Sequence, residues 1–162
     1  MDAAHDATNQ KNNPLWIYSL KQYGDPSCAT FLLDAQDTYQ LDINILLFIG
    51  WLATQKRCLD IQKLSASNIT TWQKQVIQPL RKIRLQAKTM ANNDFYQSIK
   101  KLELSAEHQE QNKLYGISHN MKKQNFEFSE CIRRGCEVYF EELGRKLEKR
   151  WLQILTQHLQ PK

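Results

Sequence analysis

The residues of this chain that could take part in binding are cations at helical spacing. Between Ile61 and Asn93 there is no Asp or Glu, whereas six Lys or Arg occur. Four of these share one side of a helix expected over about residues 66–90: Lys74, Arg81, Arg84 and Lys88. Such a run attracts an acidic partner. We take these four as the candidate binding residues, with an ordinary solvated helix face as the alternative.

Acidic residues offer a second kind of chemistry. Asp34 and Asp37 share a helix face and Asp42 follows closely, so the three could hold Mg²⁺ for phosphate hydrolysis. The alternative is that Asp42 caps the next helix and that the other two lie on the surface. Glu103 and Glu107 lie one turn apart with Lys100 near them, which favours a solvated helix face.

Motifs typical of enzymes and metal centres are missing from the sequence. No Glu precedes a His by three residues, and Cys28, Cys58, Cys131 and Cys136 lack the paired spacing of a zinc site. There is no nucleophile elbow and no phosphate-binding glycine loop. We therefore expect no catalytic residue, no metal and no cofactor, and interpret the cysteines as buried thiols.

The N-terminal half contains clear helix starts. Asn13-Pro14 and Asp25-Pro26 each place a capping side chain before a proline at the first helical position. Asp42 caps a third helix, with a bond expected near Ile45, and this helix is apolar on every side. It must lie at the centre of a helical core, with Gly50 where another helix backbone comes close.

The helix after Ser65, which we expect as its cap, carries a single apolar stripe. The stripe is Ile69, Trp72, Val76, Leu80, Ile83, Ala87 and Met90. Pro79 lies within it and predicts a kink that turns Arg81 and Arg84 outward together. The residues with expected structural roles are Trp16, Leu46, Gly50, Trp51, Trp72 and Pro79.

The C-terminal third predicts two or three more helices. One runs from about Phe95 to Leu114 and ends by Gly116, and another begins near Phe126 or Ser129. Gly144 either ends that helix or weakens it. Beyond it lies an apolar strip, Leu147, Trp151, Ile154, Leu155 and Leu159. We expect this strip to pack back on the bundle, with homodimerisation as the alternative.

Composition supports a helical protein. Leu occurs 20 times and Val twice among 162 residues, which argues against strands. We predict an all-α single domain, an irregular or orthogonal bundle of five to seven helices. Residues 1–12 are expected as a disordered tail, 13–143 as the bundle and 144–162 as an amphipathic extension. No apolar run suggests a signal peptide or a membrane span, so we expect a cytoplasmic protein.

Several segments together resemble a family of small bacterial proteins of unknown function. They are Leu15-Trp16, Gln36-Asp37, Leu41 to Phe48 with Trp51-Leu52-Ala53, Trp72, and Pro79-Leu80-Arg81 with Arg84. Glu103 and Glu107 resemble the acidic helix of that family, and the likeness covers about residues 13–143. The resemblance implies a helical fold and a bacterial origin, and it brings no catalytic residue.

These observations favour a non-enzymatic protein that binds another protein, as a regulator or adaptor, and acts as a monomer or a homodimer. A nucleic-acid-associated protein using the basic face of the 66–90 helix is the second hypothesis. That face lacks interleaved aromatic residues and no polar recognition helix follows it. A Mg²⁺-dependent helical hydrolase is the third.

Overall fold

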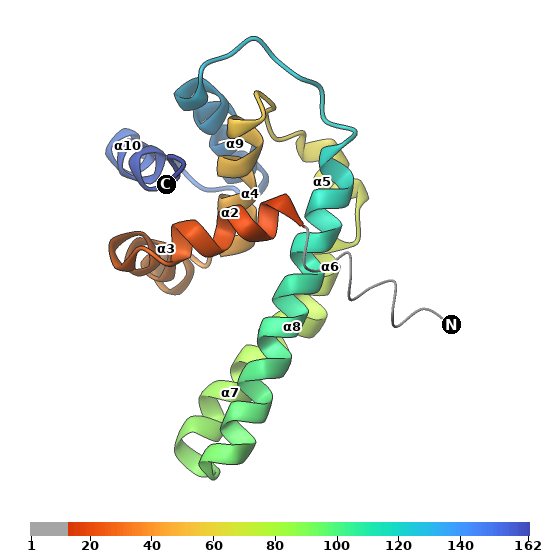
Figure 1. The fold of residues 1–162 in the computed structure, drawn as a ribbon, viewed down its shortest axis with the longest axis vertical. Helices are drawn as coiled ribbons and strands as arrows, with labels where there is room; N and C mark the ends of the chain where they lie inside the picture. Colours follow the sequence, from red (N-terminus) through yellow and green to blue (C-terminus); the bar gives the residue numbers. More distant parts are fainter. Residues whose placement is uncertain (1–12) are drawn as a thin grey trace.

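The computed structural model describes residues 13–162, so the predicted tail lies outside the described residues. This range is all-α and contains no strand, as predicted (Figure 1). Eight helices are present in it when the contiguous α6, η1 and α7 are counted as one. Their bounds are α2 Pro14–Tyr23, α3 Pro26–Tyr39, α4 Ile43–Thr54, α5 Ile61–Ala66, α6 Ile69–Trp72, η1 Gln73–Ile77, α7 Gln78–Met90, α8 Asn93–Ser118, α9 Phe128–Glu142 and α10 Lys149–His158.

Helix α4 is the centre of the core. Every residue from Asn44 to Ala53 is buried, and Leu46 and Trp51 are among them. Helices α2, α3, α8 and α9 all contact it. A helix that is apolar all round has no face to give to water, so its neighbours must enclose it. The prediction of a buried central helix is confirmed.

Local capping chemistry fixes where the first helices begin. The Asn13 side chain accepts hydrogen bonds from the backbone N–H groups of Leu15 and Trp16. Asp25 caps α3 in the same way. Asp42 accepts from the N–H of Asn44 at 2.9 Å. The predicted cap at Asp42 is confirmed, although its partner is Asn44 and not Ile45.

Gly50 lies where α4 meets the end of the chain. A Cβ atom there would stand 2.4 Å from the Tyr18 hydroxyl oxygen and 3.1 Å from Leu159 Cβ. The nearest atoms belong to side chains, and one of them, Leu159 Cβ, is bonded to the backbone directly after α10. The Tyr18 hydroxyl donates a hydrogen bond to the Leu159 carbonyl at 2.5 Å.

The segment that contains Pro79 departs from the predicted single stripe. Ser65 lies inside α5, which Asp60 caps, so the predicted helix start at Ser65 is wrong. A π-helical turn, η1, stands directly before the proline. Pro79 has no N–H to give to the carbonyl of Gln75, and a π turn is one way in which a helix absorbs such a break.

The extra residue in the π turn changes which residues of α7 face α8, although Ala87 stays buried as predicted. Ile77 is buried where Val76 was expected, and Arg84 faces α8 where Ile83 was expected. Two residues predicted for the core are therefore exposed, Ile83 and Met90, the latter 84% accessible. A periodicity of 3.6 residues cannot reveal where one residue is inserted into the turn.

Helices α7 and α8 form an antiparallel hairpin that projects from the rest of the molecule (Figure 1). Asn92 caps α8, and the helix continues past Gly116 to Ser118, so the predicted end at Gly116 is wrong. The inner face of α8 packs on α2 and α4, whereas its first turns contact α7. The hairpin extends from a broad cluster of helices, and its turn at residues 90–95 lies at the far end.

The C-terminal helix α10 folds back on the bundle, as expected. Gly144 has φ of 63°, a left-handed conformation that ends α9. Leu155 and Leu159 are completely buried, and the rings of Trp151 and Phe31 lie 5.4 Å apart. Helix α10 therefore completes the core beside α3 and α9.

Candidate functional site

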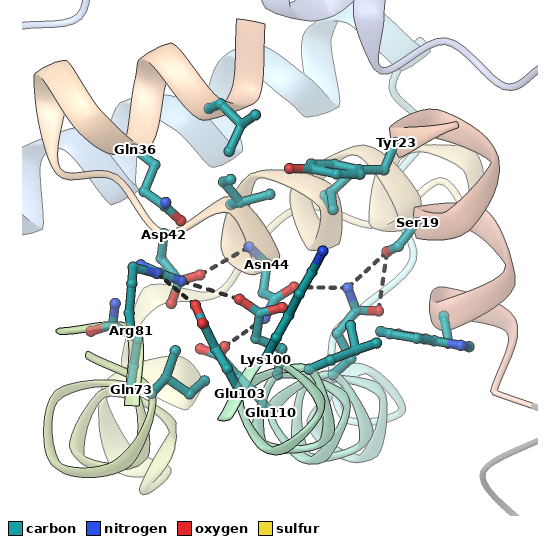
Figure 2. Close-up of a pocket in the computed structure, with 18 of the residues that line it drawn as sticks. Ser19, Tyr23, Gln36, Asp42, Asn44, Gln73, Arg81, Lys100, Glu103 and Glu110 are labelled. Atoms are coloured by element: carbon teal, nitrogen blue, oxygen red, sulfur yellow. Dashed lines mark hydrogen bonds and ion pairs between the residues drawn. The ribbon is translucent and has the colours of Figure 1, made fainter. Parts of the chain in front are cut away.

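A cavity of about 360 Å³ opens between α2, the start of α4, and the α7–α8 hairpin (Figure 2). Cavities of this size hold small organic ligands. Apolar and aromatic side chains form part of the wall: Trp16, Leu20, Tyr23, Leu33, Ile43, Leu47, Ile77 and Leu104. Polar and charged side chains form the rest: Ser19, Gln36, Asp42, Asn44, Gln73, Arg81, Arg84, Tyr96, Lys100, Glu103, Glu107, Glu110 and Gln111.

The spacing of charges along α7 and α8 places them in this cavity. Glu103, Glu107 and Glu110 follow one another by four and three residues, so they share a face of α8. Arg81 and Arg84 are three apart and share a face of α7. Because the two helices run antiparallel beside each other, the two faces meet.

Glu103 is the hub of the resulting ion pairs. Arg81 donates from Nε to Glu103 Oε1 and from a terminal nitrogen to Glu107 Oε1, each at 3.1 Å. Arg84 donates from Nε to the other oxygen of Glu103. The Glu103 side chain is only 8% exposed. A carboxylate so buried needs its partners, because removing them leaves a charge without compensation.

Burial is the largest influence on the pKa of Glu107, the second carboxylate of this group. Burial raises the pKa of Glu107, the guanidinium of Arg81 lowers it, and the charge of Glu103 raises it again. The net direction is upward. Burial therefore outweighs the attraction of Arg81 in setting the pKa of Glu107.

This geometry corrects the predicted binding residues. Arg81 and Arg84 are half-buried and paired, so the expectation that all four cations stand exposed and unpaired is wrong for these two. Lys74 and Lys88 are exposed. Glu103 and Glu107 were expected on a solvated face near Lys100, and they pair with the arginines across the hairpin. The four-cation surface on which the nucleic-acid hypothesis depended is not formed.

A chain of neutral hydrogen bonds crosses the floor of the cavity. Gln111 donates through Nε2 to Ser19 Oγ and to Asn44 Oδ1, both at 2.9 Å. Asn44 in turn donates through Nδ2 to Glu110 Oε2 at 2.6 Å. All four side chains are buried. Each hydrogen bond therefore gives a partner to a polar group that has lost its contact with water.

The chain ends at two carboxyl groups, Asp42 and Glu110. Asp42 Oδ2 and Glu110 Oε1 are buried and receive no hydrogen bond from any donor of residues 13–162. Burial raises the pKa of Glu110, and the charge of Asp42 and a hydrogen bond to it raise the pKa further. The raised pKa favours the protonated form of Glu110, in which two neighbouring carboxyl groups can share a hydrogen bond.

The predicted aspartate site is not assembled. Asp34 and Asp37 are exposed on α3, and Asp34 accepts a hydrogen bond from Thr38 at 3.0 Å. Neither lines the cavity that Asp42 enters. Within residues 13–162 no three His, Cys, Asp or Glu side chains are grouped as metal ligands would be. The suggested metal site at Asp34, Asp37 and Asp42 is therefore wrong.

One of the predicted structural residues, Trp16, borders the cavity, and two others lie nearby in the chain of helices that forms the hairpin. Trp16 lines it and stacks on His108, with ring centroids 4.0 Å apart. Trp72 ties α6 to α8, because its Nε1–H donates to the Ala106 carbonyl at 3.0 Å. Pro79 stands in the first turn of α7. All four cysteines are free thiols, and Cys58 alone among them is partly exposed.

Sequence reasoning did not find Glu110, Asn44 or Gln111. One signal was present, since Asn44 is the single amide in an otherwise apolar helix and a buried amide requires partners. Its partners lie more than 60 positions away, and only the packing of α4 on α8 identifies them.

The hairpin tip is a second candidate surface. Its exposed apolar side chains are Ile83, Leu85, Met90, Phe95 and Leu102. Exposed lysines accompany them: Lys82, Lys88 and Lys101. None of these lysines forms an ion pair with a carboxylate of residues 13–162. We call these eight residues the hairpin tip.

The fold and its two candidate surfaces define a helical domain with a projecting hairpin and a polar cavity at its base. None of the helices in residues 13–162 combines the length and apolar content needed to cross a membrane. Residues 14–114 match a family model described as "Protein of unknown function (DUF2390)". The chain belongs to this family, which confirms the resemblance seen in the sequence, although the matched region ends before residue 143.

The matched region contains α2 to α7 and most of α8, and therefore every residue that lines the cavity. No curated protein matches the chain, and no solved structure matches it.

Proposed function

We propose that this protein is a non-enzymatic binding module that docks another protein through the hairpin tip. The observation that carries the proposal is the set of exposed large apolar residues on a projecting element. Soluble monomers seldom expose contiguous apolar area without a use for it. Here the apolar side chains stand on two packed helices, where they hold a fixed arrangement before any partner arrives.

The charges of the hairpin tip indicate the chemistry of the partner. Lys82, Lys88 and Lys101 lie on the same two helices as the apolar side chains and form no ion pair within residues 13–162, and Asp94 is the one acid between positions 61 and 102. An apolar surface flanked by Asp and Glu complements this pattern. A second copy of the hairpin would bring like charges together, so a different, acidic partner fits better.

The test is site-specific photocrosslinking in living cells of the source organism. A benzophenone amino acid replaces Met90 in the full-length chain, and a matched chain carries it at the exposed Glu142 on α9. We expect a discrete protein adduct from position 90 that position 142 does not give. The adduct should disappear when Lys82 and Lys88 are both changed to Glu.

Three results would contradict the proposal: identical adducts at both positions, a self-adduct, or an adduct to nucleic acid. Circular dichroism of the purified variants verifies that each one is folded. Because Lys82 and Lys88 are exposed, their reversal should leave the free energy of unfolding within about 1 kcal/mol of the wild type.

A further inference from the structure

Two segments that are far apart in the sequence meet beside the C-terminal end of α8. Arg57 and Lys123 form an isolated antiparallel β-bridge, and the backbone N–H of Gln124 donates to the Lys56 carbonyl at 2.7 Å. Arg57 Nη1 donates to the Ser118 carbonyl at 2.5 Å. These contacts hold four cations together, which we call the basic edge: Lys56, Arg57, Lys122 and Lys123.

The basic edge has no compensating carboxylate. Its three lysines are exposed and Arg57 is half-buried. Neither 43–59 nor 111–126 contains an Asp or Glu, and none of the four cations forms an ion pair with a carboxylate of residues 13–162. The nearest acids in the sequence are Glu127 and Asp60, and Asp60 Oδ2 lies 3.7 Å from Lys63 Nζ. Like charges held together repel one another, so an anion that binds the basic edge is stabilised there.

The surface around the basic edge is polar. None of the exposed large apolar side chains of residues 13–162 lies in 54–63 or 113–127. Protein interfaces depend on aromatic or aliphatic anchors, and lasting attachment to a membrane adds inserted apolar groups to the charges. The surface therefore fits a partner that is recognised through its negative charge alone.

The aromatic rings near the basic edge are already engaged. Tyr115 contacts the rings of Trp51 and His119. The guanidinium of Arg134 lies over the Phe126 ring, 4.2 Å from its centroid. Proteins that hold single-stranded nucleic acid stack its bases on free aromatic rings. A duplex presents its phosphates without unpaired bases, so it fits this surface better than a single strand does.

From this charge and polarity we infer that the basic edge binds the phosphate backbone of duplex nucleic acid without reading its sequence. Lysine ammonium groups pair with phosphates as point charges, and condensed counterions are released. The basic edge and the turn of the hairpin lie at opposite ends of α8, ~39 Å apart at 1.5 Å per residue (Figure 1). The inference therefore goes beyond the hairpin tip and does not depend on the partner proposed for it.

The experiment measures binding of the full-length chain to a fluorescent DNA duplex by anisotropy while the NaCl concentration is raised. Between about 50 and 200 mM NaCl we expect the affinity to fall about 100-fold, as four neutralised phosphates require. Lys122→Gln combined with Lys123→Gln should weaken binding at least about tenfold and lower the salt slope by about 2. The matched control, Lys82→Gln with Lys88→Gln, removes the same charge from the hairpin tip and should bind like the wild type.

Lys56 separates binding from folding. Its φ is 54°, a left-handed conformation that favours glycine, and within residues 13–162 Gln40, with φ of 52°, is the one other non-glycine residue of positive φ. Lys56→Gly should therefore weaken binding about fivefold while its midpoint of urea unfolding rises. Gln40→Gly should show the same rise with wild-type affinity. A purely structural role of Lys56 predicts no loss of affinity in the more stable variant.

The proposal is overturned if the Lys82 and Lys88 control loses as much affinity as the Lys122 and Lys123 variant, since binding would then follow total charge. It is also overturned if polyglutamate or vesicles of anionic phospholipid bind more tightly than the duplex at equal salt. The ligand would then be an acidic protein or a membrane surface. Absence of binding at about 50 mM NaCl with protein up to about 100 µM also contradicts it. The photocrosslinking at Met90 tests the hairpin tip separately.

Discussion

The raised pKa of Glu110 links the stability of the fold to pH. Burial and then Asp42 raise its pKa, whereas a Glu in the unfolded chain loses its proton near pH ~4.3. Between that pH and the raised folded pKa, only the folded state holds the proton. Stability from this group is complete below the unfolded pKa and is lost as the pH rises toward the folded value.

We therefore expect the free energy of unfolding to fall as the pH rises from 5 to 8 by up to about 1.4 kcal/mol per pH unit from this group alone. Glu110→Gln should remove this part of the slope and be more stable than the wild type at pH 8. Urea unfolding across this range measures it, with Glu137→Gln as the control. Equal slopes for Glu110→Gln and the wild type would show that Glu110 is ionised in the fold.

The arginines at the base of the hairpin are structural. Reversing Arg81 and Arg84 to Glu places two more acids beside Glu103 and Glu107, so we expect loss of at least about 3–5 kcal/mol, the usual effect of breaking a buried pair. Thermal unfolding by circular dichroism measures it. The matched reversal of Lys82 and Lys88, on the same helix but exposed, should lower stability little; equal loss in both variants would contradict this role.

Local chemistry at single residues was predictable, whereas partners distant in sequence were not. The caps at Asn13, Asp25 and Asp42 follow from a side chain and the two or three N–H groups next to it. The ion pairs of Arg81 and Arg84 depend on the rotation that η1 introduces. The sequence positions of the two arginines do not indicate that this π turn is present.

At the scale of elements, α4 shows how tightly the core restricts side-chain size. Gly50→Ala would press a methyl group against the Tyr18 hydroxyl and Leu159, and we expect a loss of about 1–3 kcal/mol from overpacking. Gly116→Ala on α8 meets open space and should gain up to about 1 kcal/mol from helix propensity. Chemical denaturation of the pair measures both. A neutral Gly50→Ala would mean that α2 and α10 can move apart freely.

Sequence patterns predict where the first helices begin, but they do not predict which face of α7 is exposed. The starts of α2, α3 and α4 agree with the sequence because caps and prolines mark them. The residues that α7 exposes differ from those predicted. A π turn changes which residues face the core, and the amino-acid composition of the helix does not reveal it. Ile83 and Met90 are both exposed and belong to the surface on which the proposed function rests.

For the whole molecule, α10 is an integral part of the core. A chain that ends at Leu143 lacks Leu155 and Leu159, both fully buried, and exposes their neighbours on α4 and α9. Each lost Leu is worth about 2–5 kcal/mol, which approaches the whole stability of a domain. We expect this truncation to lose cooperative thermal unfolding. A folded truncated monomer in light scattering and circular dichroism would contradict the role of α10.

The hydrogen bond from Tyr18 to Leu159 joins positions 141 residues apart, and this has a consequence for biosynthesis. The ribosome delivers α2 and α4 early, but Gly50 and its neighbours meet their last contacts only when the final residues emerge. Domains fold as units, so the core around α4 closes only after α10 has left the ribosome. Before that point the apolar face of α4 that Leu155 and Leu159 help to cover lacks part of its native cover.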